Sequence, residues 1–246
     1  ILATGVKPRG LELEGANGPK VLSYLDVLEH EKPVGQKVAI IGAGGIGSQT
    51  VDLLIPALKR INQRCEIIIM DGDIVESTNL GHQKYTESDI GSSKVKCLEA
   101  KYSSSKDDGV IVRGVAENFR QLNQLKEADL VIICVDRPEP RRLVHSLEIP
   151  WIDLRCGGDG YLVMSSESEK ELVAQMTPDH EPKSCQHDGA LEIGNLEFGF
   201  AIAASYGAQW ALQQLRNCPA PIQSMGSMNF GQLSFPKINK KQKVIQ

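Results

Sequence analysis

The chain has 246 residues, of which 41% are hydrophobic and 24% charged, with a formal net charge of −4 and a pI near 5.8. This composition is typical of a soluble α/β domain that can bury a core, and it gives no general attraction to nucleic acid or to an anionic membrane. The six cysteines include no C-x-x-C pair, which argues against a zinc site and a disulfide framework. No signal peptide is recognisable, so we expect a cytoplasmic protein.

The first elements form a strand–helix–strand unit. The apolar run Val38–Ile41 leads into a glycine-rich turn, Gly42–Gly47, and apolar residues then recur at helical spacing from Val51 to Leu58. Pro56 falls inside this pattern and is expected to kink the helix or mark its end. The isoleucine-rich segment Glu66–Met70 is the next strand, and the two strands are expected to be parallel.

Three further apolar segments predict strands at 110–112, 130–135 and 151–154, with helices between them. The expected fold is therefore α/β: a Rossmann-like, mainly parallel sheet with helices on both faces. Beyond Cys156, the segments Tyr161–Met164 and Leu172–Met176 predict strands, and the polar stretch Thr177–Ala190 predicts a mobile crossing loop. Residues 224–236 predict a C-terminal β extension.

A long helix is predicted over Glu192–Leu215. Ala204, Ala208 and Ala211 lie on one face of it beside Gly207, which permits close approach of another backbone. The stripe fits either a homodimer interface or packing against the sheet of the same chain. We predict a homodimer on this basis.

The glycine-rich turn is the first signal of a binding site. Gly42 permits a tight turn, Gly44 lets a phosphate approach the backbone, and Gly47 lets the helix pack on its strand, with Gly45 between them. The helix start offers unpaired amides and a positive dipole end to an anion. Asp71 ends the second strand, where an acid binds the ribose hydroxyls of a nucleotide. The turn alone does not distinguish ATP from NAD or FAD.

From Asp71 onward the sequence resembles the ThiF/MoeB-like adenylyltransferases, the superfamily that includes ubiquitin-activating enzymes. The family pattern D-x-D-x-V-x-x-x-N-L-x-R-Q matches residues 71–83 except at one position, and a glycine followed three residues later by a lysine matches Gly91 and Lys94. Asp136, in the run Cys-Val-Asp that ends the fourth strand, matches the family's magnesium-binding aspartate. The resemblance extends over residues 38–215.

The resemblance implies a role for each matching residue. Asp71 would hold the ATP ribose, beside Asp73. Asn79 and Gln83 would lie next to the phosphates. Lys94 would neutralise the triphosphate, and Asp136 would hold Mg²⁺ against the departing pyrophosphate. Attack of a carboxylate on an α-phosphate needs such cationic groups rather than a protein nucleophile.

The sequence also departs from the family pattern. His82 stands where the family has a phosphate-contacting arginine, and histidine lacks the bidentate guanidinium fork. Arg137, Arg141 or Arg142 are candidates to compensate. In sulfur-carrier members of the family a reactive cysteine lies in the crossing loop, and Cys185 matches that place.

We expect Cys185 to be exposed, with Lys183 and His187 favouring its thiolate. An ordinary loop cysteine is the alternative. Cys156, after the fifth strand, is the second candidate for the reactive thiol.

A second resemblance involves the first 47 residues, which are similar to the linker of flavin-dependent dienoyl-CoA reductase-type oxidoreductases. We therefore divide the chain into a linker-like segment (1–35), a ThiF-like ATP-binding adenylation domain (36–236) and a basic tail (237–246). The expected function is ATP- and magnesium-dependent adenylation of the C-terminal carboxylate of a ubiquitin-like protein, sulfur carrier or peptide, with possible transfer to Cys185. The alternatives are an NAD-dependent oxidoreductase, or a fragment of one, and a nucleotide-binding partner subunit with weak catalysis.

Overall fold

The computed structural model describes residues 36–103, 109–182, 184–187 and 189–237. The linker-like segment 1–35 and the basic tail beyond Lys237 lie outside these residues. Among the described residues, none of the helices has the length and apolar character of a membrane-spanning segment.

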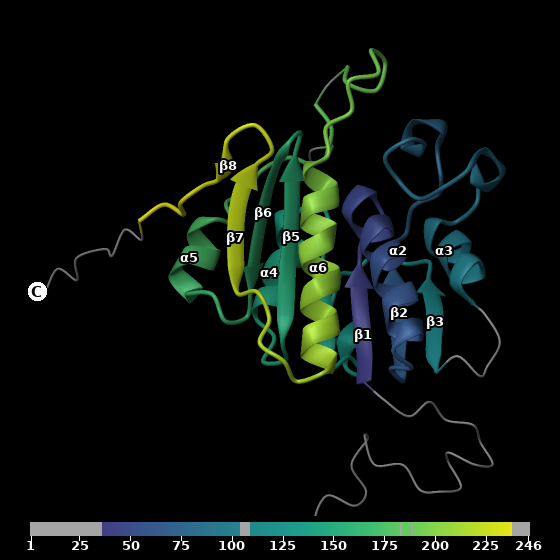
Figure 1. Cartoon of the computed structure of the whole chain (residues 1–246), viewed down its shortest axis with the longest axis horizontal. Coiled ribbons are helices and arrows are strands. Elements are labelled where there is room, and N and C mark those ends of the chain that lie inside the picture. The colour runs from purple at the N-terminus through teal and green to yellow at the C-terminus, as the bar shows by residue number, and fades with distance from the viewer. Residues whose placement is uncertain (1–35, 104–108, 183, 188, 238–246) are drawn as a thin grey trace, which may run out of the picture. The chain divides into compact units, whose positions relative to one another are not determined.

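A mixed sheet in the order β3-β2-β1-β4-β5-β6-β7-β8 organises the described residues (Figure 1). Its parallel strands are β1 (Gln36–Ile41), β2 (Cys65–Met70), β3 (Val110–Val115), β4 (Leu130–Ile133) and β5 (Trp151–Gly157). Three antiparallel strands extend it: β6 (Gly160–Ser165), β7 (Gln223–Ser227) and β8 (Gly231–Gln232). The α/β fold, its mainly parallel sheet and the C-terminal β extension are confirmed.

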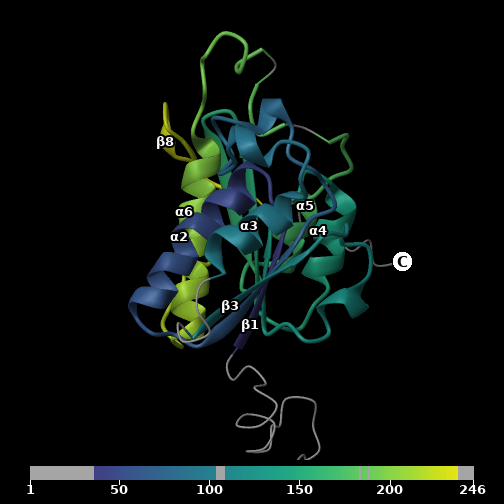
Figure 2. The same cartoon turned by 90° about the vertical axis from the view of Figure 1, so that its right-hand side faces the viewer.

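Helices cover both faces of the sheet (Figure 2). One face carries α2 (Gly45–Arg60), α3 (Lys94–Tyr102) and α6 (Gly199–Leu215), and the other carries α4 (Pro138–His145) and α5 (Lys170–Gln175). Short 3₁₀ turns lie at η1 (Ser77–Asn79), η2 (Glu87–Asp89) and η4 (Leu122–Leu125).

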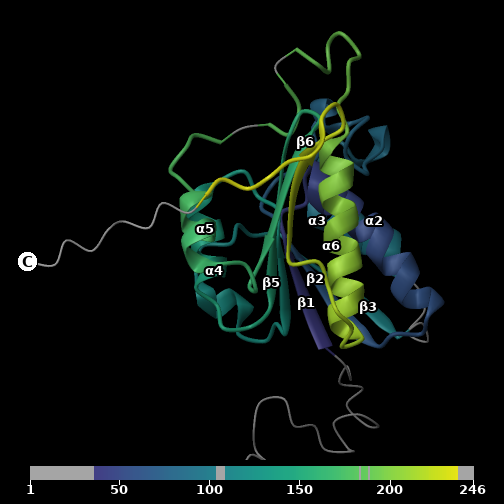
Figure 3. The ribbon, with the colours of Figure 1, turned by 60° about the vertical axis from the view of Figure 1, so that its left-hand side comes forward.

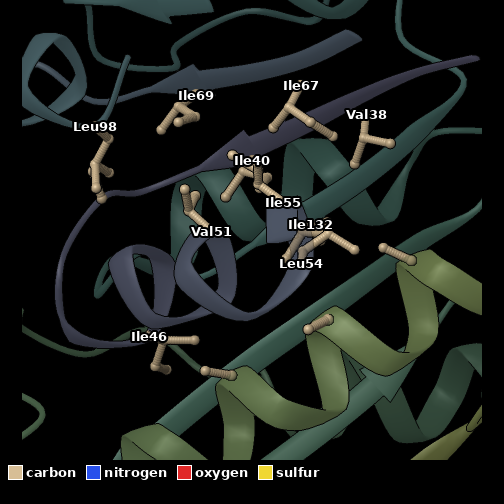
Figure 4. Packing of buried hydrophobic residues seen from close by; sticks show 14 of the residues in the cluster. Val38, Ile40, Ile46, Val51, Leu54, Ile55, Ile67, Ile69, Leu98 and Ile132 are labelled. Carbon is tan, nitrogen blue, oxygen red and sulfur yellow. The ribbon is translucent and has the colours of Figure 1, made fainter. Parts of the chain in front are cut away.

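Alternation along the central strands divides the core between the two faces. On β1, Val38 and Ile40 face the α2 side, whereas Ala39 and Ile41 face the α4 side. Leu54 and the other apolar residues of α2 pack against the first set (Figure 4). The central strands are buried on both sides, so they appear in the sequence as uninterrupted apolar runs.

Helix α2 does not end at Pro56 but continues to Arg60, and Pro56 lies on its exposed side. The strand predicted at Leu172–Met176 is wrong, because this segment forms α5. Its Leu172 and Val173 are buried, and a short apolar run does not by itself distinguish a helix from a strand.

The helix predicted to begin at Glu192 begins instead at Gly199. Two features hold the preceding residues outside it. Gly194 adopts a φ of 72°, and the Gln186 carboxamide bonds both the N–H and the C=O of Glu197. A side chain thus occupies backbone groups of Glu197 that a helix would use.

The alanine stripe of α6 packs within the chain. Ala204, Ala208 and Ala211 are buried in the core between α2 and the sheet, and Figure 3 shows α6 running beside α2. Intramolecular packing therefore accounts for the stripe, and the homodimer predicted from it loses this argument.

Gly207 allows the close approach of α6 to β5. A Cβ at this position would lie 2.4 Å from Cδ1 of Leu154 and 3.5 Å from Cγ2 of Thr50. We expect Gly207→Val to lower the free energy of unfolding by ~1–3 kcal/mol through overpacking. The matched change Gln209→Val, at an exposed position of α6, should cost less than ~0.5 kcal/mol. Urea denaturation of both variants tests this, and equal stabilities would contradict the tight packing of α6 on β5.

Candidate nucleotide-binding site

The candidate site is a pocket of about 850 Å³ where β1 and β4 end. The strand that follows β1 in the chain, β2, lies on one side of it, and the strand that follows β4, β5, lies on the opposite side. The strand order therefore reverses between β1 and β4. Ligands of open α/β sheets bind at such reversals. The pocket brings together these predicted site residues: Gly42, Gly44, Gly45, Asp71, Asp73, His82, Gln83, Lys94, Asp136 and Cys185.

The glycine turn that joins β1 to α2 packs so closely against other backbone atoms that Gly42 and Gly47 have no room for a side chain. Gly42 has a φ of 101°, and a Cβ there would lie 3.0 Å from the Cys134 carbonyl oxygen. A Cβ on Gly47 would lie 1.9 Å from the carbonyl oxygen of Gly42. A Cβ on Gly44, in contrast, would meet no atom within 4 Å. Gly44 therefore borders open space at the helix start, where an anion can approach the free amides.

Asp71 and Tyr85 fix this turn from either side. The Ala43 N–H donates to Asp71 Oδ2 at 2.6 Å, and the Asp73 N–H donates to Asp71 Oδ1 at 2.8 Å. Burial raises the pKa of the Asp71 carboxyl above its ordinary value. The Tyr85 hydroxyl donates to the Ala43 carbonyl oxygen at 2.7 Å. Tyr85 was missed in the sequence, although a lone aromatic residue in a polar stretch is a signal for it.

Lys94 begins α3 and is not a surface lysine. Only 7% of the residue is exposed, and its Nζ lies 3.4 Å from the exposed carboxylate of Asp73. The backbone assists, since the Lys94 N–H donates to the Asp73 carbonyl oxygen. This contact fastens the start of α3 to the segment after β2 and directs an ammonium group into the pocket.

Asp136 follows β4 and presents an exposed carboxylate to the pocket. Arg137 beside it and Arg120, which follows β3, also line the pocket, and neither guanidinium forms an ion pair among the described residues. Arg120 was not singled out from the sequence. Arg142, one of the expected replacements for the family arginine, is bound instead to Asp179 at 2.7 Å.

Arg141 is buried and belongs to a charge cluster around Asp153 on β5. The Asp153 carboxylate is fully buried and accepts hydrogen bonds from Arg141, from Arg155 at 2.6 Å and, at 2.9 Å, from the ring nitrogen of His145. Arg141 also donates to the Val135 carbonyl oxygen. This bond supports the turn that carries Asp136, so Arg141 reaches the pocket with its charge already compensated.

Asn79 and Gln83 differ in their placement. Asn79 does not line the pocket, and its Oδ1 accepts the backbone N–H of Glu76 at 2.9 Å within η1. Gln83 lines the pocket, and its buried Oε1 has no hydrogen-bond partner among the described residues. That oxygen is available to a ligand donor.

The environment of Cys185 differs from the prediction. The residue is half-buried, not exposed, and lies against Cys156 and His82. His187 points elsewhere, with its Nδ1 2.5 Å from the carboxylate of Glu197, and Lys183 lies outside the described residues. The sequence could not reveal the Cys156 and His82 contacts, because these residues are far from Cys185 along the chain.

Within the described ranges, no group of three or more His, Cys, Asp or Glu side chains is arranged to hold a metal ion on its own. A divalent cation at Asp136 would therefore need ligand oxygens from a bound phosphate, which is the usual way in which Mg²⁺ binds with nucleotides.

The fold and the pocket together define a Rossmann-like nucleotide-binding domain. The ThiF family model matches residues 22–244, and the chain belongs to this family.

Several known proteins are similar. The chain is 29% identical over 169 residues to cinnamate reductase of Clostridium sporogenes, covering 67% of this chain and 24% of the relative. It is 31% identical over 137 residues to ubiquitin-like modifier-activating enzyme 5 of Drosophila mojavensis, covering 49% of this chain and 32% of the relative. The chain thus spans a third or less of the length of these relatives.

Among solved structures, E. coli MccB with ATP superimposes with a TM-score of 0.60 at 19% identity, covering 87% of this chain and 68% of that one. At this identity the likeness shows the shared fold.

Two alanine substitutions in the glycine turn should separate folding from binding. We expect Gly47→Ala to destabilise the protein by at least ~3 kcal/mol, since its Cβ meets backbone and not a movable side chain. Gly44→Ala should unfold at the wild-type temperature but lose the rise in Tm caused by Mg-ATP, because its Cβ projects into the binding space. Thermal unfolding with and without nucleotide measures both. A wild-type nucleotide response in Gly44→Ala would exclude the turn as the phosphate site.

Proposed function

We propose that this chain adenylates a carboxylate with ATP, most suitably the C-terminal carboxylate of a peptide, ubiquitin-like protein or sulfur carrier. One observation carries the proposal. A single pocket combines an open glycine turn, a half-buried acid at the ribose position, a buried lysine and an exposed acid. These are the groups that binding and polarising a triphosphate require.

The geometry supports a role for each group. Asp71 is fixed by two backbone donors, and its remaining lone pairs can accept ribose hydroxyls. The amides at the start of α2 would hold the phosphates. When the carboxylate oxygen attacks the α-phosphorus, an O–P bond forms, the bond to the β-phosphate bridge breaks, and pyrophosphate leaves. Lys94, Arg120 and Arg137 surround the space in which this negative charge moves.

Asp136 is the residue that we assign to Mg²⁺. Its carboxylate is exposed in the pocket, so it can bind a cation that also binds phosphate oxygens. Bound Mg²⁺ would neutralise charge on the pyrophosphate group.

The relatives support the class of acceptor. Ubiquitin-like modifier-activating enzyme 5 is named for activating a ubiquitin-like protein, and MccB has been crystallised with ATP and with N-formylated MccA. We therefore propose a protein or peptide terminus as acceptor. A homodimer also remains our proposal, although the α6 stripe no longer supports it.

We further propose that the activated acyl group passes to Cys185. The thiol lines the same pocket as the residues that would bind the nucleotide, so a thioester could form without long-range movement. Adenylation itself needs no protein nucleophile, and the two steps are therefore separable by experiment.

An NAD-dependent oxidoreductase is the second candidate, favoured by the match to cinnamate reductase. A glycine turn followed by Asp71 suits the ribose of NAD equally well. The buried Lys94 and the exposed Asp136 favour ATP, because a dinucleotide does not require a cation clamp for its pyrophosphate. A nucleotide-binding subunit with weak catalysis would keep the pocket but release no pyrophosphate.

We expect Mg²⁺-dependent ATP–pyrophosphate exchange in the presence of a competent acceptor, and its loss in Asp136→Ala. Removing an electrostatic group at the reacting phosphates should lower exchange by at least ~100-fold. Exchange of labelled pyrophosphate into ATP is the measurement. The matched control is Glu139→Ala, which removes another exposed carboxylate of the same pocket and should have only a weak effect.

Undiminished exchange in Asp136→Ala would remove the role assigned to this residue. In the same preparations Mg-ATP should raise Tm. At a hundredfold excess over Kd, the free energy of unfolding should increase by ~2.7 kcal/mol. Stabilisation by NADH instead of ATP would favour the oxidoreductase.

Cys185→Ala should retain pyrophosphate exchange and lose the reductant-sensitive adduct with the acceptor. Non-reducing electrophoresis and intact-mass measurement detect the adduct, and Cys218→Ala, which removes an exposed cysteine after α6, is the control. An adduct that persists in Cys185→Ala but disappears in Cys156→Ala would move the acceptor to Cys156. No adduct with wild-type protein and a competent acceptor would mean that the reaction stops at the adenylate.

A further inference from the structure

Two side chains from distant parts of the chain meet at the first residue of α2, and a third adjoins them. Cys185 Sγ lies 2.9 Å, and His82 Cδ2 3.5 Å, from the point that a Cβ on Gly45 would occupy. The thiol of Cys156, near the end of β5, lies close enough to Cys185 for the two to affect each other's pKa. All three side chains line the candidate nucleotide pocket. This cluster of Cys156, Cys185 and His82 is separate from the residues assigned to phosphate and magnesium.

The loop that carries Cys185 is held by hydrogen bonds at Cys185 and at the next residue. The Gly158 N–H donates to the Cys185 carbonyl oxygen at 3.1 Å. The adjacent Gln186 is buried and bonds the backbone of Glu197 at 2.7 and 2.9 Å. The position of the thiol over Gly45 is therefore fixed by backbone contacts and does not depend on packing alone.

His82 is only 4% exposed and packs edge-on against Phe200, with ring centroids 6.1 Å apart. Its Nε2 lies 3.3 Å from Gln83 Nε2, while Nδ1 is buried without a hydrogen-bond partner among the described residues. An unpartnered buried nitrogen is costly unless it has a ligand or a chemical role. Because the Gln83 Nε2 can only donate, His82 Nε2 accepts this bond, and the neutral ring carries its hydrogen on Nδ1 as a buried donor without an acceptor among the described residues.

The two thiols of the cluster differ in pKa. The hydrogen bond from Cys156, together with the contact of His82, lowers the pKa of Cys185 to about 5 despite its burial. The same hydrogen bond, followed by burial, raises the pKa of Cys156. Cys185 is therefore the more acidic of the two thiols.

Other titratable groups face the cluster from behind Cys156. They are Arg141 on α4, which lowers the pKa of Cys156, and Cys134 after β4, which raises it. The Cys134 thiol itself points to the carbonyl oxygen of Ile41 at 3.1 Å. In the loop, His187 is bound to Glu197, and Lys183 and Asp188 lie outside the described residues.

We propose that His82 and Cys156 are positioning residues that make Cys185 the nucleophile for the activated acyl group. The proposal rests on the proposed function for its substrate, an acyl adenylate. Cys185 reacts as a thiolate, its charge stabilised by the neighbouring Cys156 thiol and His82 ring, and its sulfur attacks the acyl carbon. A C–S bond forms, and the C–O bond to AMP breaks with its electron pair leaving on the phosphate oxygen. The products are a thioester and AMP.

The test is the pH profile of Cys185 alkylation by iodoacetamide in the full chain, without ATP or acceptor. Peptide mass spectrometry follows Cys185, with the exposed Cys218 as an internal reference in the same digest. In wild type, we expect the rate to be constant above about pH 6 and to fall only as the pH drops through about 5, because a lowered pKa keeps the thiolate at acidic pH. In His82→Asn and Cys156→Ala, the midpoint of the pH profile should move toward the pKa of an ordinary thiol, ~8.5.

At pH 6 these variants should react about tenfold more slowly, after allowing for the greater nucleophilicity of a thiolate of higher pKa. Cys156→Ser, which keeps a hydroxyl donor, should lie between wild type and Cys156→Ala. A wild-type profile with an ordinary thiol midpoint would overturn the proposal, as would folded variants whose profiles coincide with that of wild type. If one variant fails to fold, the midpoint of the wild-type pH profile and the profile of the other variant test the proposal. Because no ATP is present, absent pyrophosphate exchange would count against the proposed function and leave this result standing.

Discussion

The contact between the two ends of the glycine turn sets the geometry on which the rest of the site depends. Gly47 lies so close to the Gly42 carbonyl oxygen that no side chain fits between them. Helix α2 must therefore start directly at the end of β1, with its first residues lining the pocket beyond the ends of β1 and β4. Asp71 and Tyr85 then bind the two polar groups of Ala43, so the segments after β2 and before α3 are fastened to the same turn.

A second constraint is the buried carboxylate of Asp153. An isolated buried charge would be strongly unfavourable, and three basic side chains surround this one. Burial and the neighbouring guanidinium groups lower the pKa of His145 to about 3, which keeps that ring neutral. The cluster joins β5 to α4, and through Arg141 it supports the Val135 carbonyl next to Asp136. The cluster around Asp153 therefore stabilises the turn that carries Asp136, the residue assigned to Mg²⁺.

The sequence predicts those parts of the fold that have local causes. Buried strands such as β1 appear as apolar runs, and the glycine turn is recognisable from the backbone demands of Gly42 and Gly47. The errors have non-local causes. Helix α5 owes its position to burial under the sheet, and α6 begins late because Gln186 holds the Glu197 backbone. The partners of Cys185 were mistaken for the same reason, since sequence neighbours are not always spatial neighbours.

His82 shows how a departure from a family pattern depends on its surroundings. Taken alone, histidine in place of a phosphate-binding arginine indicates a weakened clamp. In the folded chain the position is enclosed by Gly45, Phe200 and Cys185, with Gln83 beside it. An arginine there would bring an additional charge and a longer side chain into a buried space beside a thiol. The pocket already contains Lys94, Arg120 and Arg137 as cations, so phosphate charge can be balanced without a contribution from position 82. The shorter, titratable ring is thus better suited to act on Cys185 than to replace the guanidinium fork.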